Sequence, residues 1–213
     1  MTASDLDLIK ETFLRKYRCD VSMPGVSVAP GFLLDARGAS ELFAVYSGAS
    51  FEGGLYRFLR VEKISEWTQA ACAAFPQFAG RIQCFSSDWL GRLFALDSQR
   101  EVDEQPGVLM LEPGMAKALE IPANFLTFHC SELIEFADAA IARETYVEWH
   151  AKNMERLQGT ECVGYKVPPF LGGADAIDNM ERTDMRMYWD LCAQLIQQIR
   201  SLPEGTKIQK VSL

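Results

Sequence analysis

The chain has 213 residues, of which 48% are hydrophobic and 23% charged, and its formal net charge is −8. This composition is typical of a folded protein with one sizeable core or two small ones, and it excludes an intrinsically disordered chain. The negative charge also argues against direct binding to nucleic acid, because a phosphate backbone would be repelled.

The N-terminal part predicts helices that alternate with strands. Apolar residues recur at helical spacing behind Ser4, which predicts an amphipathic helix over residues 4–17 with Ser4 as its cap. Four further elements are predicted: a turn-rich stretch at 18–31, a helix at 40–46, a strand at 54–61 and a helix at 62–75 that ends before Pro76.

A β-hairpin is predicted in the middle of the chain. The apolar segments 80–85 and 92–97 flank residues 86–91, SSDWLG, in which Ser, Asp and Gly are typical turn residues. The apolar run at 108–114 closes with Pro-Gly and predicts another strand, and residues 121–130 predict a strand or extended segment.

The C-terminal part is predicted to be mainly helical. Ser131 begins one helix, with Leu133, Ile134 and Phe136 on its apolar side. The remaining elements are predicted in this order: a second helix through Ile141, Tyr146, Trp149, Met154 and Leu157 to Gly159, a rigid loop GYKVPPFLGG at 164–173, a long helix from Tyr188 to about Leu202, and a last strand within 202–213.

Strands interleaved with helices indicate an α/β or α+β fold, with mixed sheets and packed helices. We expect two closely associated subdomains, residues 1–104 and 105–213, that meet near residues 100–112. The opening residues MTASDLDLIKETF contain neither a basic region nor an apolar run, and no stretch approaches the roughly 20 apolar residues of a membrane span. A cytoplasmic protein with no membrane partner is therefore expected.

The negative charge is concentrated in residues 101–148. That segment holds ten Asp and Glu residues against Lys117 and Arg143, whereas the parts before and after it are each neutral. Two interpretations remain open: the carboxylates are solvated surface that aids solubility, or they attract a basic partner.

Cysteine spacing gives no sign of a metal or redox site. The six cysteines form no CxxC or CxxH pair, so we expect reduced, mostly buried thiols, no bound metal and no cofactor.

Several segments together resemble a known bacterial family. These are GASFEGGLYRFL (48–59), DWLGRLFALD (88–97), LEPG (111–114) and GYKVPPFLGG (164–173), followed by DNMERTDMRMYWDLCAQLIQQI (178–199). They resemble a family with a GAD-related N-terminal part and a C-terminal domain of type VI secretion immunity proteins. That family includes immunity proteins that neutralise DNase toxins delivered between bacteria. On this resemblance, residues 1–104 correspond to the GAD-related part and 105–213 to the immunity-type part.

The resemblance implies a protein that binds a cognate toxin and performs no chemistry of its own. We interpret its motif residues as fold-defining: glycines would allow a sharp turn, and aromatic residues would fill the core beneath the loop. These residues are Trp89, Pro168, Leu171, Gly172, Gly173, Tyr188 and Trp189.

A DNase presents a cationic groove to DNA, so a focused acidic surface would be steered toward it. The favoured toxin contacts are the carboxylates of the helical region, Glu132, Glu135, Asp138, Glu144 and Glu148. A second, loop-borne group consists of Glu101, Asp103 and Glu104.

Two other classes of function compete with this one. A hydrolase would use His129 or His150 beside Cys130, Glu132 or Glu148, yet the chain has no HExxH, GxSxG, GxGxxG or GxxxxGK[ST] motif. A small-ligand or peptide-binding module would use Trp89 and the aromatic residues of 164–173 to line a pocket.

Overall fold

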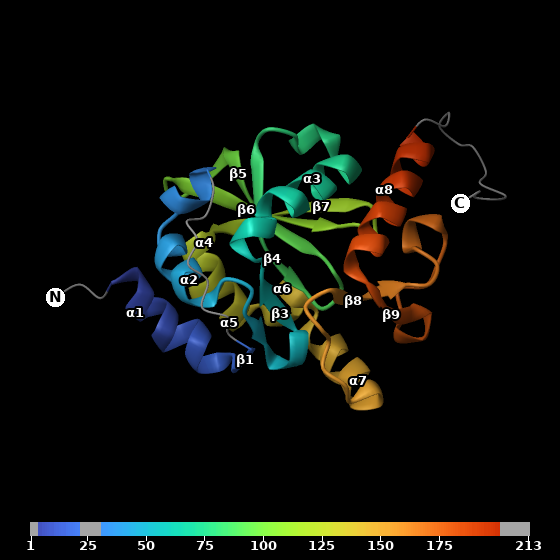
Figure 1. The fold of residues 1–213 in the computed structure, drawn as a ribbon, viewed down its shortest axis with the longest axis horizontal. Helices are drawn as coiled ribbons and strands as arrows, with labels where there is room; N and C mark the ends of the chain where they lie inside the picture. The colour runs from blue at the N-terminus through green and yellow to red at the C-terminus, as the bar shows by residue number, and fades with distance from the viewer. Residues whose placement is uncertain (1–3, 22–30, 201–213) are drawn as a thin grey trace.

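The computed structural model describes residues 4–21 and 31–200, and it confirms a mixed α+β fold (Figure 1). Seven antiparallel strands form one sheet in the order of the sequence, and two further strands form a small antiparallel sheet. The seven are β1 (Cys19–Val21), β2 (Ser50–Phe51), β3 (Tyr56–Phe58), β4 (Ile82–Asp88), β5 (Leu93–Val102), β6 (Gln105–Glu112) and β7 (Lys117–Asn124); the small sheet pairs β8 (Glu161–Tyr165) with β9 (Met180–Asp184).

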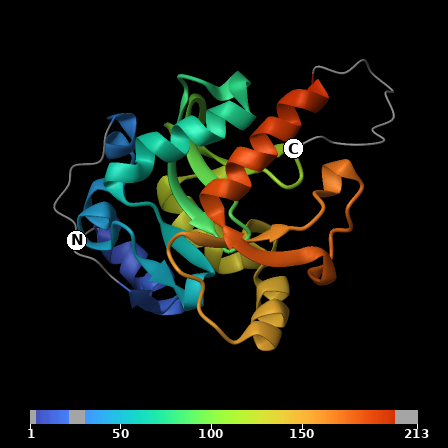
Figure 2. The same cartoon turned by 45° about the vertical axis from the view of Figure 1, so that its right-hand side comes forward.

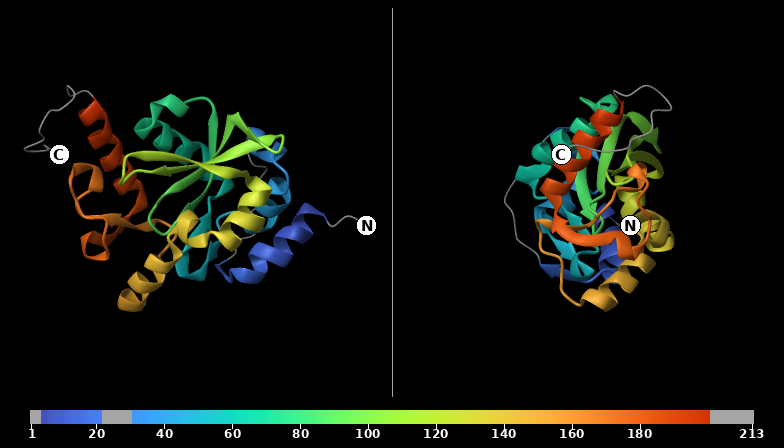
Figure 3. Two further views of the ribbon diagram at one scale, coloured as in Figure 1. Left: turned by 180° about the vertical axis from the view of Figure 1, so that it is seen from behind. Right: turned by 90° about the vertical axis from the view of Figure 1, so that its right-hand side faces the viewer.

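Helices cover both faces of the large sheet. The α-helices are α1 (Asp5–Ile9), α2 (Ala39–Tyr46), α3 (Ile64–Ala74), α4 (Phe125–Thr127), α5 (Leu133–Glu135), α6 (Ala137–Ile141), α7 (Arg143–Asn153) and α8 (Met185–Arg200). Two π-helical segments, η1 (Lys10–Leu14) and η6 (Phe128–Glu132), continue α1 and α4. The helices α3 and α8 lie together on one face, and α4 to α7 lie on the other (Figure 3).

Several short 3-10 turns connect these elements. They are η2 (Gly31–Asp35), η3 (Glu52–Gly54), η4 (Val61–Lys63), η5 (Pro76–Phe78), η7 (Pro169–Leu171) and η8 (Ile177–Asn179). Most predicted helices and the hairpin at 80–97 are confirmed. Ser4 caps α1 as predicted, because its hydroxyl accepts a hydrogen bond from the Asp7 amide at 3.2 Å.

The turn between β4 and β5, residues Asp88–Arg92, joins the sheet to the C-terminal elements. Within it, the buried Asp88 carboxylate accepts from the backbone amides of Leu90 and Arg92 and from Arg92 Nε, the last at 2.6 Å. Four further hydrogen bonds connect this turn to other elements. The turn donates from Arg92 Nη2 to Ala140 O and from Trp89 Nε1 to Ile141 O. It accepts at Gly91 O from Trp189 Nε1 and at Trp89 O from Val163 N. The turn thereby contacts α6, β8 and α8 together.

An aromatic core fills the space between the sheet and α4–η6. Phe85 on β4 packs against Phe125 with ring centroids 5.1 Å apart, and Phe94 packs against Phe128 at the same separation. His129 lies at the centre of this core and is fully buried. Its Nδ1 is 2.7 Å from Phe125 O and its Nε2 is 2.9 Å from the Tyr56 hydroxyl.

Nδ1–H donates to the Phe125 carbonyl, and in the neutral imidazole Nε2 accepts from the Tyr56 hydroxyl. Burial is the main cause that lowers the pKa of His129, to about 4. His129 is therefore a satisfied core residue.

The GYKVPPFLGG segment is a corner held by Asn179. The Asn179 side chain donates to Val167 O and Ala174 O, both at 2.7 Å, and accepts from Val167 N at 3.1 Å. Pro168 is buried, Leu171 is half-buried in η7, and Gly172 ends η7 with a left-handed φ of 91°. Gly173 packs so closely that a Cβ there would lie 1.8 Å from Val167 O.

The two aromatic residues of α8 have separate places. The Tyr188 hydroxyl accepts from Tyr165 N at 3.3 Å, near the start of the corner, whereas Trp189 packs against Phe75 and bonds to the β4–β5 turn.

Three sequence predictions are wrong. Residues 125–130 are helical, because the Asn124 side chain accepts from Thr127 N and Thr127 Oγ1 accepts from Asn124 N, which together cap a helix start. The helix predicted to reach Gly159 ends at Asn153, since Met154 adopts a left-handed φ of 46° and is exposed. Phe136 is not on an apolar side: 54% of it is exposed.

Two predicted segments lie wholly or mostly outside the described residues. The last strand, within 202–213, lies outside the described residues, as does most of the 18–31 stretch. The expected subdomain boundary at residue 104 lies in the turn between β5 and β6 of the large sheet. Within 4–21 and 31–200, no helix combines the length and the apolar character needed to cross a membrane.

The corner generates a stability prediction. Gly173→Ala is expected to lower the free energy of unfolding by about 3 kcal/mol, because the added Cβ would collide with Val167 O. Gly172→Ala should lower it by about 1–2 kcal/mol, because alanine is strained at positive φ although the space there is open. Urea denaturation measures both changes.

Gly159→Ala is the control, because Gly159 has open space around it and no positive φ. Its free energy of unfolding should change by no more than about 0.5 kcal/mol. Equal effects at all three positions would contradict the assignment of the corner.

The buried histidine generates a prediction about pH. The folded-state pKa of His129, about 4, lies below the ordinary value of 6.5, so only the unfolded chain binds a proton between these values. The neutral His129 therefore contributes to the free energy of unfolding, fully above pH 6.5 and progressively less as the pH falls toward 4. Between pH 7.5 and pH 5 the free energy of unfolding should fall by about 2 kcal/mol. Urea denaturation at the two pH values should show this loss, and His129→Gln should reduce it. An NMR titration of His129 with a midpoint near 6.5 would refute the assignment.

Candidate functional site

Five carboxylates of the predicted toxin-binding set lie on the helical layer between η6 and α7. We call Glu132, Glu135, Asp138, Glu144 and Glu148 the helical acidic surface. All are exposed except Glu132, which is half-buried and whose pKa is raised mainly by that burial. These side chains come from η6, α5, α6 and α7, and their contact with a toxin stays a prediction.

Two members of the helical acidic surface also have local structural roles. Asp138 Oδ1 accepts a hydrogen bond from the Glu144 amide at 2.9 Å and so satisfies a donor in the first turn of α7. Glu148 forms an exposed ion pair with Lys152 at 3.1 Å, one helical turn later. Glu135 and Glu144 have exposed carboxylates with no ion pair recorded among the described residues. They are the members most available to a partner.

The N-terminal helix holds this layer in place. The Tyr17 hydroxyl donates to Leu133 O at 2.5 Å, and Lys16 Nζ donates to Leu133 O at 3.2 Å and to Ile134 O at 2.5 Å. These are carbonyls near the end of the η6–α5 helical run, where orphan acceptors need donors. Burial raises the pKa of Tyr17 to about 12, so the hydroxyl remains a donor at neutral pH.

Exposed apolar residues accompany the carboxylates. Phe136 lies between α5 and α6, and Val147 lies on α7 between Glu144 and Glu148; 54% of each is exposed. Exposed aromatic residues are enriched among the anchors of protein interfaces. Sequence reasoning missed Phe136 as a surface residue because its spacing from Leu133 matches an apolar helix face.

The second predicted group, which we call the turn acidic group, consists of Glu101, Asp103 and Glu104. All three are exposed, and Asp103 and Glu104 form the β5–β6 turn with φ of 51° and 60°. Two successive positive φ values are those of the tight hairpin turn whose twist matches the flanking strands.

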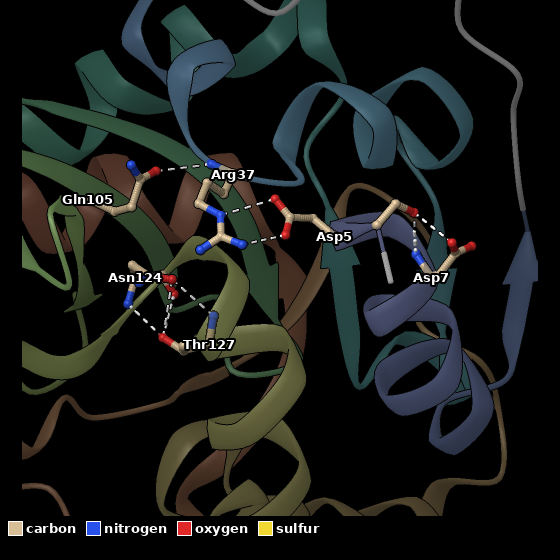
Figure 4. Close-up of polar contacts among 7 residues, drawn as sticks. Asp5, Asp7, Arg37, Gln105, Asn124 and Thr127 are labelled. Atoms are coloured by element: carbon tan, nitrogen blue, oxygen red, sulfur yellow. Dashed lines mark hydrogen bonds and ion pairs between the residues drawn. The ribbon is translucent and has the colours of Figure 1, made fainter. Parts of the chain in front are cut away.

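Side-chain hydrogen bonds connect this turn to its surroundings. Asn124 Nδ2 donates to Val102 O at 3.2 Å. Gln105 Oε1 accepts from the Arg37 amide at 3.1 Å (Figure 4). Arg37 in turn makes a bidentate ion pair with Asp5 of α1, at 3.1 and 2.7 Å. The turn acidic group is therefore held in one position.

The two acidic groups are separated in space. The turn acidic group lies beside Asn124, where the helical run Phe125–Glu135 begins, and the helical acidic surface starts where that run ends. Eleven residues of helix span about 15 Å. Glu112, also within the acidic segment, is buried near Arg92, and burial raises its pKa. The ten carboxylates of residues 101–148 are thus the two surface groups, the exposed Glu120 on β7 and the buried Glu112.

The side chains on which a hydrolase would depend include His129, Cys130 and His150. His129 is closed within the core, and burial raises the pKa of the neighbouring Cys130 thiol, which leaves it a weak nucleophile. His150 stacks on Tyr146 at 5.3 Å. Among the described residues, no group of three or more His, Cys, Asp or Glu side chains could hold a metal ion. The six cysteines are free thiols.

Trp89 does not line an open pocket. It is fully buried, and its ring packs against Tyr146 and Trp149 with centroids 5.4 and 5.9 Å away. The ligand-binding alternative therefore loses its principal residue.

The solved structures with a similar fold include one that is matched over most of both chains. The crystal structure of Atu4351 from Agrobacterium tumefaciens matches with a TM-score of 0.54 and 15% sequence identity, over 87% of this chain and 88% of that one. At this identity the similarity concerns the fold alone. No curated protein matches the chain.

A family model matches the C-terminal part by sequence. Residues 130–196 match the model of the type VI secretion system immunity protein Tdi1, C-terminal. The match includes the helical acidic surface from Glu132 to Glu148, the corner at 164–173 and most of α8. The match supports a relationship of residues 130–196 to the type VI secretion immunity protein family.

Proposed function

We propose that this protein is a cytoplasmic immunity protein that neutralises a cognate type VI secreted toxin by stoichiometric binding, and that the toxin is a DNase. The family match over residues 130–196 is the observation that carries this proposal. The immunity family suggests a non-catalytic inhibitor, and the buried, neutral His129 supports that reading.

The helical acidic surface is the proposed first contact. A nuclease groove that binds a polyanion is cationic, and exposed carboxylates opposite it accelerate association by electrostatic steering. Glu135 on α5 and Glu144 on α7 support this role best, because both side chains are exposed. The turn acidic group would contribute only at longer range, since it lies at the opposite end of the helical run.

Charge alone does not supply tight binding. An interface of about 1,600 Å² with a few desolvated anchors is typical of stable complexes. Phe136 supports the role of such an anchor, because it combines an exposed ring with the neighbouring carboxylates Glu132, Glu135 and Asp138. Burial of the ring against the toxin would remove apolar surface from water.

Reversal of three charges tests the electrostatic part. We expect Glu135→Lys, Glu144→Lys and Glu148→Lys together to slow association with the cognate toxin at least tenfold at low salt. They should also weaken the dependence of the association rate on salt. Stopped-flow association measures both quantities. Titration of toxin-catalysed DNA cleavage should show that inhibition by the unmodified protein saturates at one molecule per toxin.

The matched control reverses three exposed carboxylates elsewhere, Glu11→Lys, Glu41→Lys and Glu181→Lys, with the same change in net charge. The control should retain a larger share of the association rate. If both triple variants associate equally, the helical acidic surface is not the steering surface. If the unmodified protein neither binds the toxin nor inhibits it, the proposed function itself is wrong.

Truncation of the aromatic side chain tests the anchor. Phe136→Ala is expected to weaken toxin binding by about 2 kcal/mol, roughly thirtyfold in Kd, mainly through faster dissociation. The ring is more than half exposed in the free protein, so thermal stability should change little. Met187→Ala on α8, at 70% exposed, is the control and should leave Kd unchanged. A Phe136→Ala complex that dissociates as slowly as the parent rules out this anchor.

A further inference from the structure

A pocket of about 630 Å³ lies on the face of the sheet opposite the helical acidic surface. Its walls come from β2 and β3, from η4 and the start of α3, from residues 158–160 before β8, and from the start of α8. Figure 2 shows α3 and α8 side by side with the strand β8 running beneath them. The pocket is therefore enclosed by four separate parts of the sequence: residues 48–67, Ser87 on β4, residues 158–160, and residues 184–186 at the end of β9 and the start of α8.

The pocket is cationic in a protein whose net charge is −8. Its walls include four basic side chains, Arg57, Arg60, Lys63 and Arg186, and two acidic ones, Glu66 and Asp184. Glu66 is shared by two of the cations, at 2.7 Å from Lys63 and 3.5 Å from Arg186. Asp184 Oδ1 is engaged by the Met187 amide at 2.9 Å. Basic side chains thus outnumber acidic ones four to two among the wall residues, and carboxylates beside the walls pair with two of them: Glu62 with Arg60 at 3.4 Å and Asp190 with Arg186 at 3.0 Å.

The first turns of two long helices add to this positive potential. Glu66 and Trp67 lie in the first turn of α3, and Met185 and Arg186 lie in the first turn of α8. The helix dipole makes such turns favourable for anions, while the amides of Met185 and Met187 are already bonded to Thr160 O and Asp184 Oδ1. Both helices exceed ten residues, so their dipoles are developed along several turns.

An unpartnered buried group lies in the same wall. Arg57 is only 4% exposed; its Nη1 donates to Gln158 O and Glu161 O, at 2.7 and 2.6 Å, while its Nε has no partner among the described residues. Ser50 pairs directly with Arg57 across the strands, and the buried Ser50 Oγ likewise lacks a partner within the described part of the chain. Unpaired buried donors are costly and are commonly found where a ligand or water completes them.

The remaining walls combine neutral polar residues, among them Ser87 and Thr160, with apolar ones. The apolar residues include Leu59, Trp67 and Met185, and Trp67 is partly exposed. A cavity with apolar walls and a few convergent polar groups is typical of a small-molecule site. We propose that this pocket binds a small organic anion, with its phosphate or carboxylate head among Arg60, Lys63 and Arg186 and a flat apolar body against Trp67 and Met185.

Phosphate and carboxylate share the chemistry that these cations recognise, so two probes distinguish them. Phenyl phosphate and benzoate are titrated separately into the full-length protein at low salt, with benzyl alcohol as the neutral counterpart, and backbone amide shifts are followed by NMR. We expect saturable shifts for at least one anion at residues lining the pocket, and tighter binding by one anion assigns the head group. Benzyl alcohol should bind at least tenfold more weakly.

The variant Lys63→Gln with Arg186→Gln removes two cations whose side chains are 52% and 43% exposed, so the fold should be retained. It is expected to weaken anion binding at least tenfold. The control Lys10→Gln with Lys152→Gln removes two exposed, ion-paired lysines outside the pocket and should bind as the parent does. Absence of saturation with both anions, equal binding by benzyl alcohol, or equal loss in both double variants would overturn the proposal. None of these outcomes depends on the toxin.

Discussion

The buried pair of Asp88 and Arg92 is the interaction on which the arrangement of the molecule depends. A carboxylate and a guanidinium taken out of water are stable only when their remaining hydrogen-bonding groups are satisfied. Asp88 meets this condition with two backbone amides, and Arg92 with the carboxylate and Ala140 O. The pair consequently fixes the β4–β5 turn in one conformation.

That fixed turn presents its own groups to three distant segments. The Trp89 indole reaches Ile141 O, Gly91 O receives the Trp189 indole, and Trp89 O receives Val163 N. Arg57 on the neighbouring strand β3 extends the same network, because its guanidinium donates to the carbonyls of Gln158, Glu161 and Asp88. The helical layer with its carboxylates and the segments enclosing the cationic pocket are thereby attached to one point of the sheet.

Helices and strands whose apolar residues follow one clear spacing could be predicted from the sequence. Segments whose apolar residues fit both a helix and a strand could not. The hairpin around SSDWLG follows from turn residues between apolar runs, and α8 follows from its 3.6-residue spacing. Residues 121–130 are apolar enough for a buried strand or a buried helix, and only the Asn124–Thr127 cap decides between them. Met154 fits the helical period, yet its left-handed backbone ends the helix.

The same distinction applies to the candidate sites. The concentration of acidic residues in 101–148 is visible in the sequence, but its division into two surface groups, the exposed Glu120 and the buried Glu112 depends on tertiary packing. The cationic pocket has no sequence signature, because Arg57, Lys63 and Arg186 are brought together from separate segments by the docking of α8 against α3. Spacing along one chain carries no information about such convergence.

The long-range bonds of the β4–β5 turn have a consequence for the order of folding during synthesis. The strands of the meander pair with sequence neighbours, so the sheet can assemble as soon as β7 has left the ribosome. The Gly91 carbonyl can accept its hydrogen bond only after Trp189, 98 residues later in the chain, has been synthesised. Until α8 emerges, the nascent domain exposes the apolar surface that α8 will cover, and a chaperone has its longest opportunity to bind there.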